Sequence, residues 1–320
     1  MKMYRAICDE LYNRPHLIMR EKLEAIAELI EARRRGEDVV IGEADEEEDD
    51  GPQAYLVAAD GERFAVDDAK ARSQSKGGLT AVVPLFGTLL QHAGLMTQYS
   101  GGTSTTEFGA VLAELDADED IGAIVIEVHS PGGQVWGTAE VAEKLYRIRE
   151  AGKTRIVAVA NSLAASAAVW IATAAGEFVS TPGGDIGSIG VLSYHTDYSK
   201  MEEKAGIKTT LIATPPEKIE GHPYEPLPDD VRARIEKETE KLYGTFRAAV
   251  AKHRGVTVET VDEKFGGGRM LMADEADAAG LVDRVATFDD VLSEISGSQR
   301  PRKSRRGNRN RLLMAEAESA

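Results

Sequence analysis

The chain has 320 residues, of which 42% are hydrophobic and 29% are charged, and its formal net charge is −16. That balance is typical of a globular protein with a sizeable core and argues against a disordered chain. The excess of acidic residues argues against nucleic acid as the main partner. The single cysteine, Cys8, excludes an intrachain disulfide and a metal site built on cysteines.

The N-terminal segment is charged throughout and lacks the continuous apolar core of a signal peptide, and we expect no membrane span. Apolar residues at helical spacing predict a helix over about 20–35. The acidic run Glu43–Asp50 is typical of a solvated linker. We therefore expect a helical leader over 1–40 and an acidic linker over 41–78, with a short strand at Ala54–Val57.

Strands alternate with helices through the main domain, which we expect to span 79–296. The predicted strands are Leu79–Gly87, Ile121–Ser130, Thr154–Ala160, Glu177–Ser180 and Ile189–Tyr194. The predicted helices cover 102–115, 137–152, 162–175 and Asp229–Arg254, and two shorter helices precede Phe288. This alternation predicts an α/β fold with a mostly parallel sheet and right-handed crossovers. The basic, Gly- and Ser-rich segment 297–320 predicts a disordered tail.

The sequence HSPGGQVWG, from His129 to Gly137, directly follows a predicted buried strand. Open α/β sheets usually place their sites at the C-terminal ends of strands. Glycines there let backbone N–H groups face a developing oxyanion without an intervening side chain. Taken alone, the pattern is more typical of an ordinary strand-to-helix turn.

A second motif, NSLAASAAVW from Asn161 to Trp170, places Ser166 among alanines at the start of a predicted helix. Small neighbours allow a peptide backbone to approach closely, and a helix N-terminus favours negative charge nearby. Taken alone, this motif is more typical of tight packing between a helix and a sheet.

A serine hydroxyl is a poor nucleophile until a base takes its proton. The candidate bases are His129, His195, His222, Lys200 and Lys218. A lysine can serve only if burial lowers its pKa from about 10.4 toward neutrality, which costs about 1.4 kcal/mol per unit. The Pro-rich loop around Lys218 is a place where a lysine is normally exposed. The residue pattern by itself therefore does not choose between the lysines and the histidines.

Taken in order, the motifs resemble the signal peptide peptidase A family, and most closely its phage and prophage branch, the head-maturation proteases. The resemblance runs from about Leu79 to Leu292. It is carried by PLFGTL at 84–89, SPGG at 130–133, AAS at 164–166, GSIGV at 187–191, YSK at 198–200 and GLVD at 280–283. The N-terminal stretch LYNRPHLI also resembles the leader of the phage branch. The resemblance implies a crotonase- and Clp-protease-like fold with flanking helices that assembles into rings.

The resemblance also implies a serine endopeptidase with a Ser–Lys dyad and no cofactor or metal. Ser166 matches the nucleophile, and Lys218 matches the general base. Gly133 matches the donor of one oxyanion N–H, and we place the second donor at Ala167. Ser188 matches the serine that hydrogen-bonds the lysine amine. In the family the serine and the lysine can come from neighbouring subunits.

The substrates implied by the resemblance are the scaffold or portal protein of an immature capsid and the enzyme itself. The protein is then expected in the cytoplasm of a bacterial host and inside the procapsid. Small residues in the tail RLLMAEAESA predict self-trimming near Met314–Ala317. The sequence departs from cellular members at AASAA, where they have AASGG, and this change is expected to narrow the space beside Ser166.

Four other functions remain compatible with the sequence. One is a host-type cytoplasmic peptidase that cleaves signal peptides or degrades proteins. A crotonase-like hydratase would use the glycine turn and need no serine nucleophile, whereas a Clp-like protease would use a histidine such as His195. The last is a capsid assembly factor that kept the fold and lost turnover.

Overall fold

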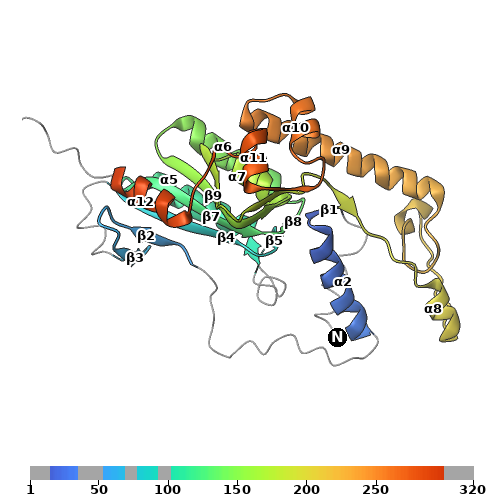
Figure 1. Ribbon diagram of the computed structural model, residues 1–320. Coiled ribbons are helices and arrows are strands. Elements are labelled where there is room, and N and C mark those ends of the chain that lie inside the picture. The colour runs from blue at the N-terminus through green and yellow to red at the C-terminus, as the bar shows by residue number, and fades with distance from the viewer. Residues whose placement is uncertain (1–14, 35–52, 69–77, 93–101, 299–320) are drawn as a thin grey trace, which may run out of the picture.

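Parallel strands form the centre of the main sheet in the computed structural model, which describes residues 15–34, 53–68, 78–92 and 102–298 (Figure 1). The parallel strands are β4 (Leu79–Phe86), β7 (Ile121–Ser130), β9 (Arg155–Ala165), β10 (Glu177–Ser180), β11 (Asp185–Gly187) and β14 (Arg284–Val285). Antiparallel strands complete the edges: β13 (Met270–Met272) beside β11, and β2 (Tyr55–Val57) and β3 (Arg63–Ala65) beyond β4. The structure confirms the predicted mixed α/β arrangement.

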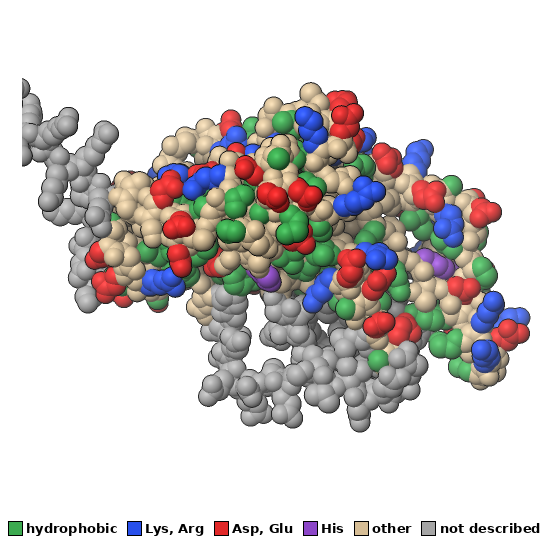
Figure 2. Space-filling view, in the orientation of Figure 1, with side chains coloured by type: hydrophobic (Ala, Val, Ile, Leu, Met, Phe, Trp, Pro, Cys, Tyr) green, Lys and Arg blue, Asp and Glu red, His purple; other side chains and the backbone are tan. Residues whose placement is uncertain are grey.

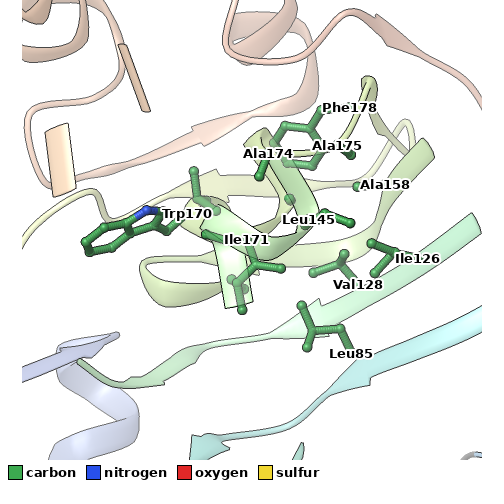
Figure 3. Packing of buried hydrophobic residues seen from close by; sticks show 14 of the residues in the cluster. Leu85, Ile126, Val128, Leu145, Ala158, Trp170, Ile171, Ala174, Ala175 and Phe178 are labelled. Atoms are coloured by element: carbon green, nitrogen blue, oxygen red, sulfur yellow. The ribbon is translucent and has the colours of Figure 1, made fainter. Parts of the chain in front are cut away.

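Three helices connect the central strands: α5 (Thr105–Ala117), α6 (Thr138–Ala151) and α7 (Ala167–Thr173). In Figure 3, Ile171 of α7 and Ala174 at its C-terminal cap lie beside Leu145 of α6 and the sheet residue Ala158. All four side chains are fully buried. Apolar side chains meet in this layer because each helix turns its periodic hydrophobic face toward the sheet. This packing fixes where α7 begins, immediately after β9.

Four further helices follow along the chain: α9 (Asp229–Arg254), α10 (Val258–Lys264), α11 (Ala273–Ala279) and α12 (Phe288–Ser298). The ring of Phe246 on α9 stacks on Trp170 of α7, with ring centroids 4.7 Å apart. On the other side of the sheet, α12 packs Val291 and Ile295 against a separate cluster rich in strand valines. The main sheet is therefore covered on both faces, as expected for parallel strands.

A second sheet lies beside the main one, with the strand order β12-β1-β8-β5-β6. Its strands are β1 (Pro15–Ile18), β5 (Leu89–Leu90), β6 (Thr103–Ser104), β8 (Gly132–Gln134) and β12 (Leu192–Ser193). The N-terminal strand β1 runs antiparallel to both of its neighbours. It continues into α2 (Arg20–Arg34), which stands below the main sheet in Figure 1.

Residues 194–228, which we call the arm, extend away from the main sheet at the right of Figure 1. The arm contains α8 (Ser199–Lys204) and the short 3-10 helix η1 (Pro216–Ile219). Its two ends are tied together, because the N–H of Tyr198 donates to the Pro223 carbonyl at 2.7 Å.

The predicted helices over 20–35 and Asp229–Arg254 are confirmed. The predicted helix over 162–175 begins later, at Ala167, because Leu163 to Ala165 pair with β11 and stay extended as part of β9. The strand predicted at Ile189–Tyr194 is shorter, since only Leu192 and Ser193 pair in β12.

Two strands lie within the segment predicted as a linker. They are β2 and β3, and β2 pairs with both β3 and β4 of the main sheet. Helix α12 continues to Ser298, just past the predicted limit at 296. The acidic run Glu43–Asp50 and the predicted tail from 299 onward lie outside the described residues. Among the helices that are described, none combines the length and apolar character needed to cross a membrane.

His253 provides a stability prediction for this packing. The residue is 4% exposed, stacks on Tyr146 and lies 3.1 Å from Thr173 Oγ1 through its Nδ1 atom. Burial lowers the pKa of His253 to about 4, and the charges of Lys252 and Arg149 act in the same direction. The folded state therefore keeps the ring neutral at pH values where the unfolded chain would bind a proton.

Stability from His253 is full above the unfolded pKa of 6.5 and is lost as the pH falls toward 4. Urea unfolding measures the free energy of unfolding at about pH 7.5 and at about pH 5. Between these two pH values, wild type should lose about 2 kcal/mol more of this free energy than His253→Gln. His92→Gln, at an exposed histidine, is the control and should keep the wild-type pH dependence. Equal losses for wild type and His253→Gln would contradict the assignment.

Candidate active site

Ser166 occupies a sharp turn between β9 and α7. Its backbone has φ 53° and ψ −114°, a conformation that side-chain-bearing residues rarely adopt. The Ser166 N–H donates to the Gly187 carbonyl at 2.8 Å, and the Ser166 carbonyl accepts from the Trp170 N–H at 3.1 Å. A strained strand-to-helix turn of this kind is typical of a nucleophilic serine, because it projects the side chain away from both elements.

Two glycines bring the backbone of β8 against this turn. A Cβ atom on Gly132 would lie 2.2 Å from the Leu17 carbonyl oxygen and 3.0 Å from Ser166 Cβ. A Cβ atom on Gly133 would lie 1.9 Å from the Leu89 carbonyl oxygen. Neither position has room for a side chain, so only backbone faces Ser166 from this strand.

The hydroxyl of Ser130, two residues before Gly132, fixes the chain where it enters this glycine pair. Its Oγ atom donates to the Gly87 carbonyl at 2.6 Å and accepts from the Gly132 N–H at 3.2 Å. Ser130 is fully buried, so both bonds lie in a protected environment. The SPGG motif is therefore a tied turn with a structural role for its serine.

Four of the five predicted site residues come together around this turn. Ala167 directly follows Ser166 in the chain. Gly133 directly follows Gly132, the glycine that lies against Ser166. Ser188 lies beside them, because the preceding Gly187 carbonyl accepts the Ser166 N–H. Ser188 also has a positive φ of 54°, and its N–H donates to the Arg269 carbonyl at 2.8 Å. Among the residues that the structure describes, the Ser166 hydroxyl contacts the Gly190 carbonyl, at 3.5 Å.

Lys218 is not brought to the serine within one chain. It lies in η1 on the arm, where its side chain is exposed, whereas Ser166 is 1% exposed. Among the described contacts, no hydrogen bond or ion pair joins Lys218 to Ser166 or Ser188. Within a single chain, Ser166 and Lys218 therefore lie in separate places.

The three histidines considered as bases contact other groups. His129 Nδ1 lies 3.0 Å from both the Asn161 carbonyl and Ser162 Oγ. His195 Nε2 lies 3.3 Å from the His222 carbonyl, and His222 Nε2 lies 3.3 Å from Glu225. Within the described part of the chain, none of the three is hydrogen-bonded to Ser166. This arrangement does not favour a histidine-based dyad.

An open cleft of about 640 Å³ begins beside the turn, at Gly190, and runs between β12 and α9. Its lining combines apolar side chains such as Ile189 and Tyr243 with charged ones such as Arg232 and Glu236. The lining includes Gly190, whose carbonyl the Ser166 hydroxyl contacts, so the cleft lies one residue contact away from the serine.

Comparisons with known proteins identify the family. Residues 148–300 match peptidase family S49, and this segment contains Ser166, Ser188 and Lys218. A putative protease of Synechocystis, slr0021, is 31% identical over 197 residues, which cover 61% of this chain and 70% of that protein. The chain belongs to peptidase family S49.

Phage proteins are among its S49 relatives. Capsid assembly protease C of Escherichia phage lambda is 31% identical over 236 residues, covering 74% of this chain and 53% of the phage protein. Head-tail preconnector protein GP5 of Enterobacteria phage P21 is 31% identical over 216 residues, which cover 68% of this chain and 42% of the phage protein. These matches confirm the predicted family, and the chain spans about half the length of the phage relatives.

The strand β1 is the feature of the site that the sequence analysis missed. The leader was expected to be helical, but Pro15–Ile18 forms a strand whose Leu17 carbonyl lies against Gly132. The available signal was a proline, which is tolerated as the first residue of a strand, followed by apolar residues. A four-residue strand is too short to be distinguished by periodicity.

Replacing Ser166 tests the strain at the turn. Ser166→Gly should be more stable to unfolding than Ser166→Ala by about 1 kcal/mol, because glycine adopts this positive φ without a steric cost. The same pair of changes at Ser193, an exposed strand residue without a positive φ, should reverse the order. Chemical unfolding of the four variants measures both differences, and an Ala-favouring result at Ser166 would contradict the strained geometry.

Proposed function

We propose that the chain is a serine endopeptidase of the Ser–Lys type. The observation that carries this proposal is the strained turn of Ser166, which sits directly against the two glycines of β8. Membership of peptidase family S49 supports peptide-bond hydrolysis as the chemistry. The three histidines considered as alternatives have other partners, which leaves Lys218 as the base supported by the family resemblance.

In the proposed mechanism, the neutral Lys218 amine takes the proton of the Ser166 hydroxyl as its oxygen attacks the substrate carbonyl. The backbone N–H groups of Gly133 and Ala167 stabilise the oxyanion that forms. Lys218 then donates its proton to the leaving amine as the C–N bond breaks. Water then attacks the acyl-enzyme while the lysine accepts its proton, and the lysine returns that proton to the Ser166 oxygen as the ester C–O bond breaks. The Ser188 hydroxyl positions the lysine amine throughout.

We propose further that the dyad forms between subunits of a ring with a crotonase- and Clp-protease-like fold. A lysine acts as a base only where it is desolvated, and Lys218 is exposed on the arm of a single chain. The arm also carries exposed apolar side chains, visible at the right of Figure 2. They are Met201, Ile207, Leu211 and Ile212, the last of them 94% exposed. A neighbouring subunit that covers this surface would bury both the apolar patch and the lysine.

The proposed substrates are proteins of an immature phage capsid: a scaffold protein, a portal protein and the enzyme itself. The similarity to capsid assembly protease C of phage lambda supports this assignment. The proposed location is the procapsid, reached from the cytoplasm of the bacterial host. Self-trimming near Met314 would appear as a shorter intact mass for wild type than for Ser166→Ala.

A fluorophosphonate probe tests the dyad. The assembled wild type should be labelled once, at Ser166, while Ser166→Ala and Lys218→Ala should lose labelling by at least about 100-fold. Lys200→Ala, at a second exposed lysine of the arm, is the matched control and should react like wild type. Labelling that survives Lys218→Ala but disappears when a histidine is replaced would move the base to that histidine.

Mixing two inactive variants tests the division of the site between subunits. Ser166→Ala supplies an intact lysine and Lys218→Ala an intact serine, so mixed rings contain complete dyads at some interfaces. Co-assembly should restore a substantial fraction of wild-type labelling, all of it on Lys218→Ala chains, which intact mass distinguishes. No recovery in oligomers shown by native mass to be mixed would indicate a dyad within one chain.

A further inference from the structure

The leader, defined here as β1 and α2 (residues 15–34), places a strand in the gap between β8 and β12. Leu17 and Ile18 pair with Gly133 and Gly132 on one side, and His16 pairs with Leu192 on the other. The Met19 N–H donates to the Pro131 carbonyl at 2.9 Å, which continues the pairing by one residue. A single short strand thus joins the glycine turn to the edge of the arm.

This strand brings a peptide carbonyl to the nucleophile. The position that a Cβ of Gly132 would take is 2.2 Å from the Leu17 carbonyl oxygen and 3.0 Å from Ser166 Cβ. The Leu17 carbonyl oxygen and Ser166 Cβ can therefore be no further apart than the sum of those two distances. Leu17 is also the register partner of Gly133, the proposed oxyanion donor. The leader therefore holds an extended backbone where a cleavable peptide would have to lie.

The side chains of β1 fill apolar surroundings on both faces of the strand. Leu17 is fully buried in the main core, and Ile18 is 4% exposed in a separate small cluster. That cluster joins Ile18 to Leu23 and Ala27 of α2, and it packs against Leu192 and Tyr194. An occupant of the gap is thus an extended segment with apolar residues at successive positions.

Across the described residues, few contacts hold helix α2 of the leader in place, and none of them involves a proposed catalytic residue. Helix α2 is held through Leu23 and Ala27 and through a hydrogen bond from the Tyr198 hydroxyl to Glu31. Tyr198 belongs to the arm, so the leader touches the element that carries Lys218 as well as the glycine turn. Removal of the leader would free the edges of β8 and β12 that face β1 and would uncover Ser166 at the same time.

We infer that the gap between β8 and β12 is the peptide-binding groove and that β1 is an intramolecular competitor that keeps the site latent. Unpaired strand edges bind extended peptides by main-chain hydrogen bonds, with side-chain pockets providing selectivity. A substrate must displace β1, so its apparent affinity is reduced by the fraction of molecules in which the leader is docked. This inference rests on the proposed function for the identity of the groove's natural occupant.

One pair of variants in the full chain tests displacement. Ala27→Asp buries a carboxylate in the leader cluster, whereas Ala25→Asp makes the same change at an exposed position of the same helix. The probe is a fluorescent peptide RPHLIMR, with the same peptide carrying Asp at its Leu and Ile positions as the negative control. In a Ser166→Ala background, Ala27→Asp should bind the probe at least about tenfold more tightly than Ala25→Asp.

A reversible lock provides the opposite test. Pro15 and Ser193 are register partners in the antiparallel β1–β12 pair, so Pro15→Cys with Ser193→Cys can form a disulfide in a Cys8→Ser background. The oxidised protein should exclude the probe peptide. A reductant should restore the probe binding of the unlocked protein. Adding Ala27→Asp to the reduced double-cysteine protein should tighten probe binding further. Tyr55→Cys with Ala65→Cys, a register pair of β2 and β3 far along the sheet, is the control lock and should have no effect.

The outcomes separate this inference from the proposed function. Equal peptide binding by Ala27→Asp and Ala25→Asp, or by the locked and unlocked proteins, would overturn the competitor role of β1. Fluorophosphonate labelling of the same variants with Ser166 intact reports the chemistry. Peptide binding that responds to the leader in a protein whose Ser166 never reacts would support the groove and overturn proteolysis.

Discussion

The close approach of backbone around Gly132 and Gly133 is the constraint on which the site depends. A side chain at either position would collide with a carbonyl oxygen, of Leu17 or of Leu89 respectively. The absence of side chains lets β8 lie between β1 and β5 and against the turn of Ser166. The buried hydroxyl of Ser130 links the Gly132 N–H to the Gly87 carbonyl that follows β4, and so holds the glycines in place. Ser166, the proposed oxyanion donors and the proposed groove all take their positions from this contact.

The surroundings of Ser166 explain how its strained backbone is maintained. The four alanines of AASAA, which are Ala164, Ala165, Ala167 and Ala168, are fully buried. Their small side chains allow β9 to pair with β11 on one side of the turn while α7 packs onto the core on the other. The strain costs about 1–3 kcal/mol, and the buried packing on both sides outweighs it. The alanines in place of glycines thus serve to fill the core around the turn.

The site is divided between two parts of the chain that differ in physical character. Ser166 lies in a rigid, buried layer, whereas Lys218 lies on an exposed arm tied mainly to itself and to α9. The leader bridges these parts, since β1 pairs with β8 and α2 bonds to Tyr198 of the arm. Assembly and leader release would therefore act on the same narrow region. With the proposed dyad and the proposed role of β1, the protease would be silent until both conditions are met, which suits the proposed work inside a closed capsid.

Local patterns in the sequence determined much of the fold and the type of chemistry. Hydrophobic periodicity located α9 and the strands β4, β7 and β10, because each buries a continuous or periodic apolar face whatever its partners are. The ordered motifs identified the family and marked Ser166, Gly133 and Ser188 as neighbours, because strand ends and turns carry recognisable residues.

Only the tertiary structure decided the features that depend on contacts between distant segments. The extension of β9 to Ala165 follows from pairing with β11, and the strand at Pro15–Ile18 exists because β8 and β12 flank it. The separation of Lys218 from Ser166 was equally beyond local reasoning, since a loop lysine carries no signal of the surface it will meet. Local sequence specifies which residues prefer to be extended or helical, but the strand partner and the burial of a side chain are set by residues far away in the chain.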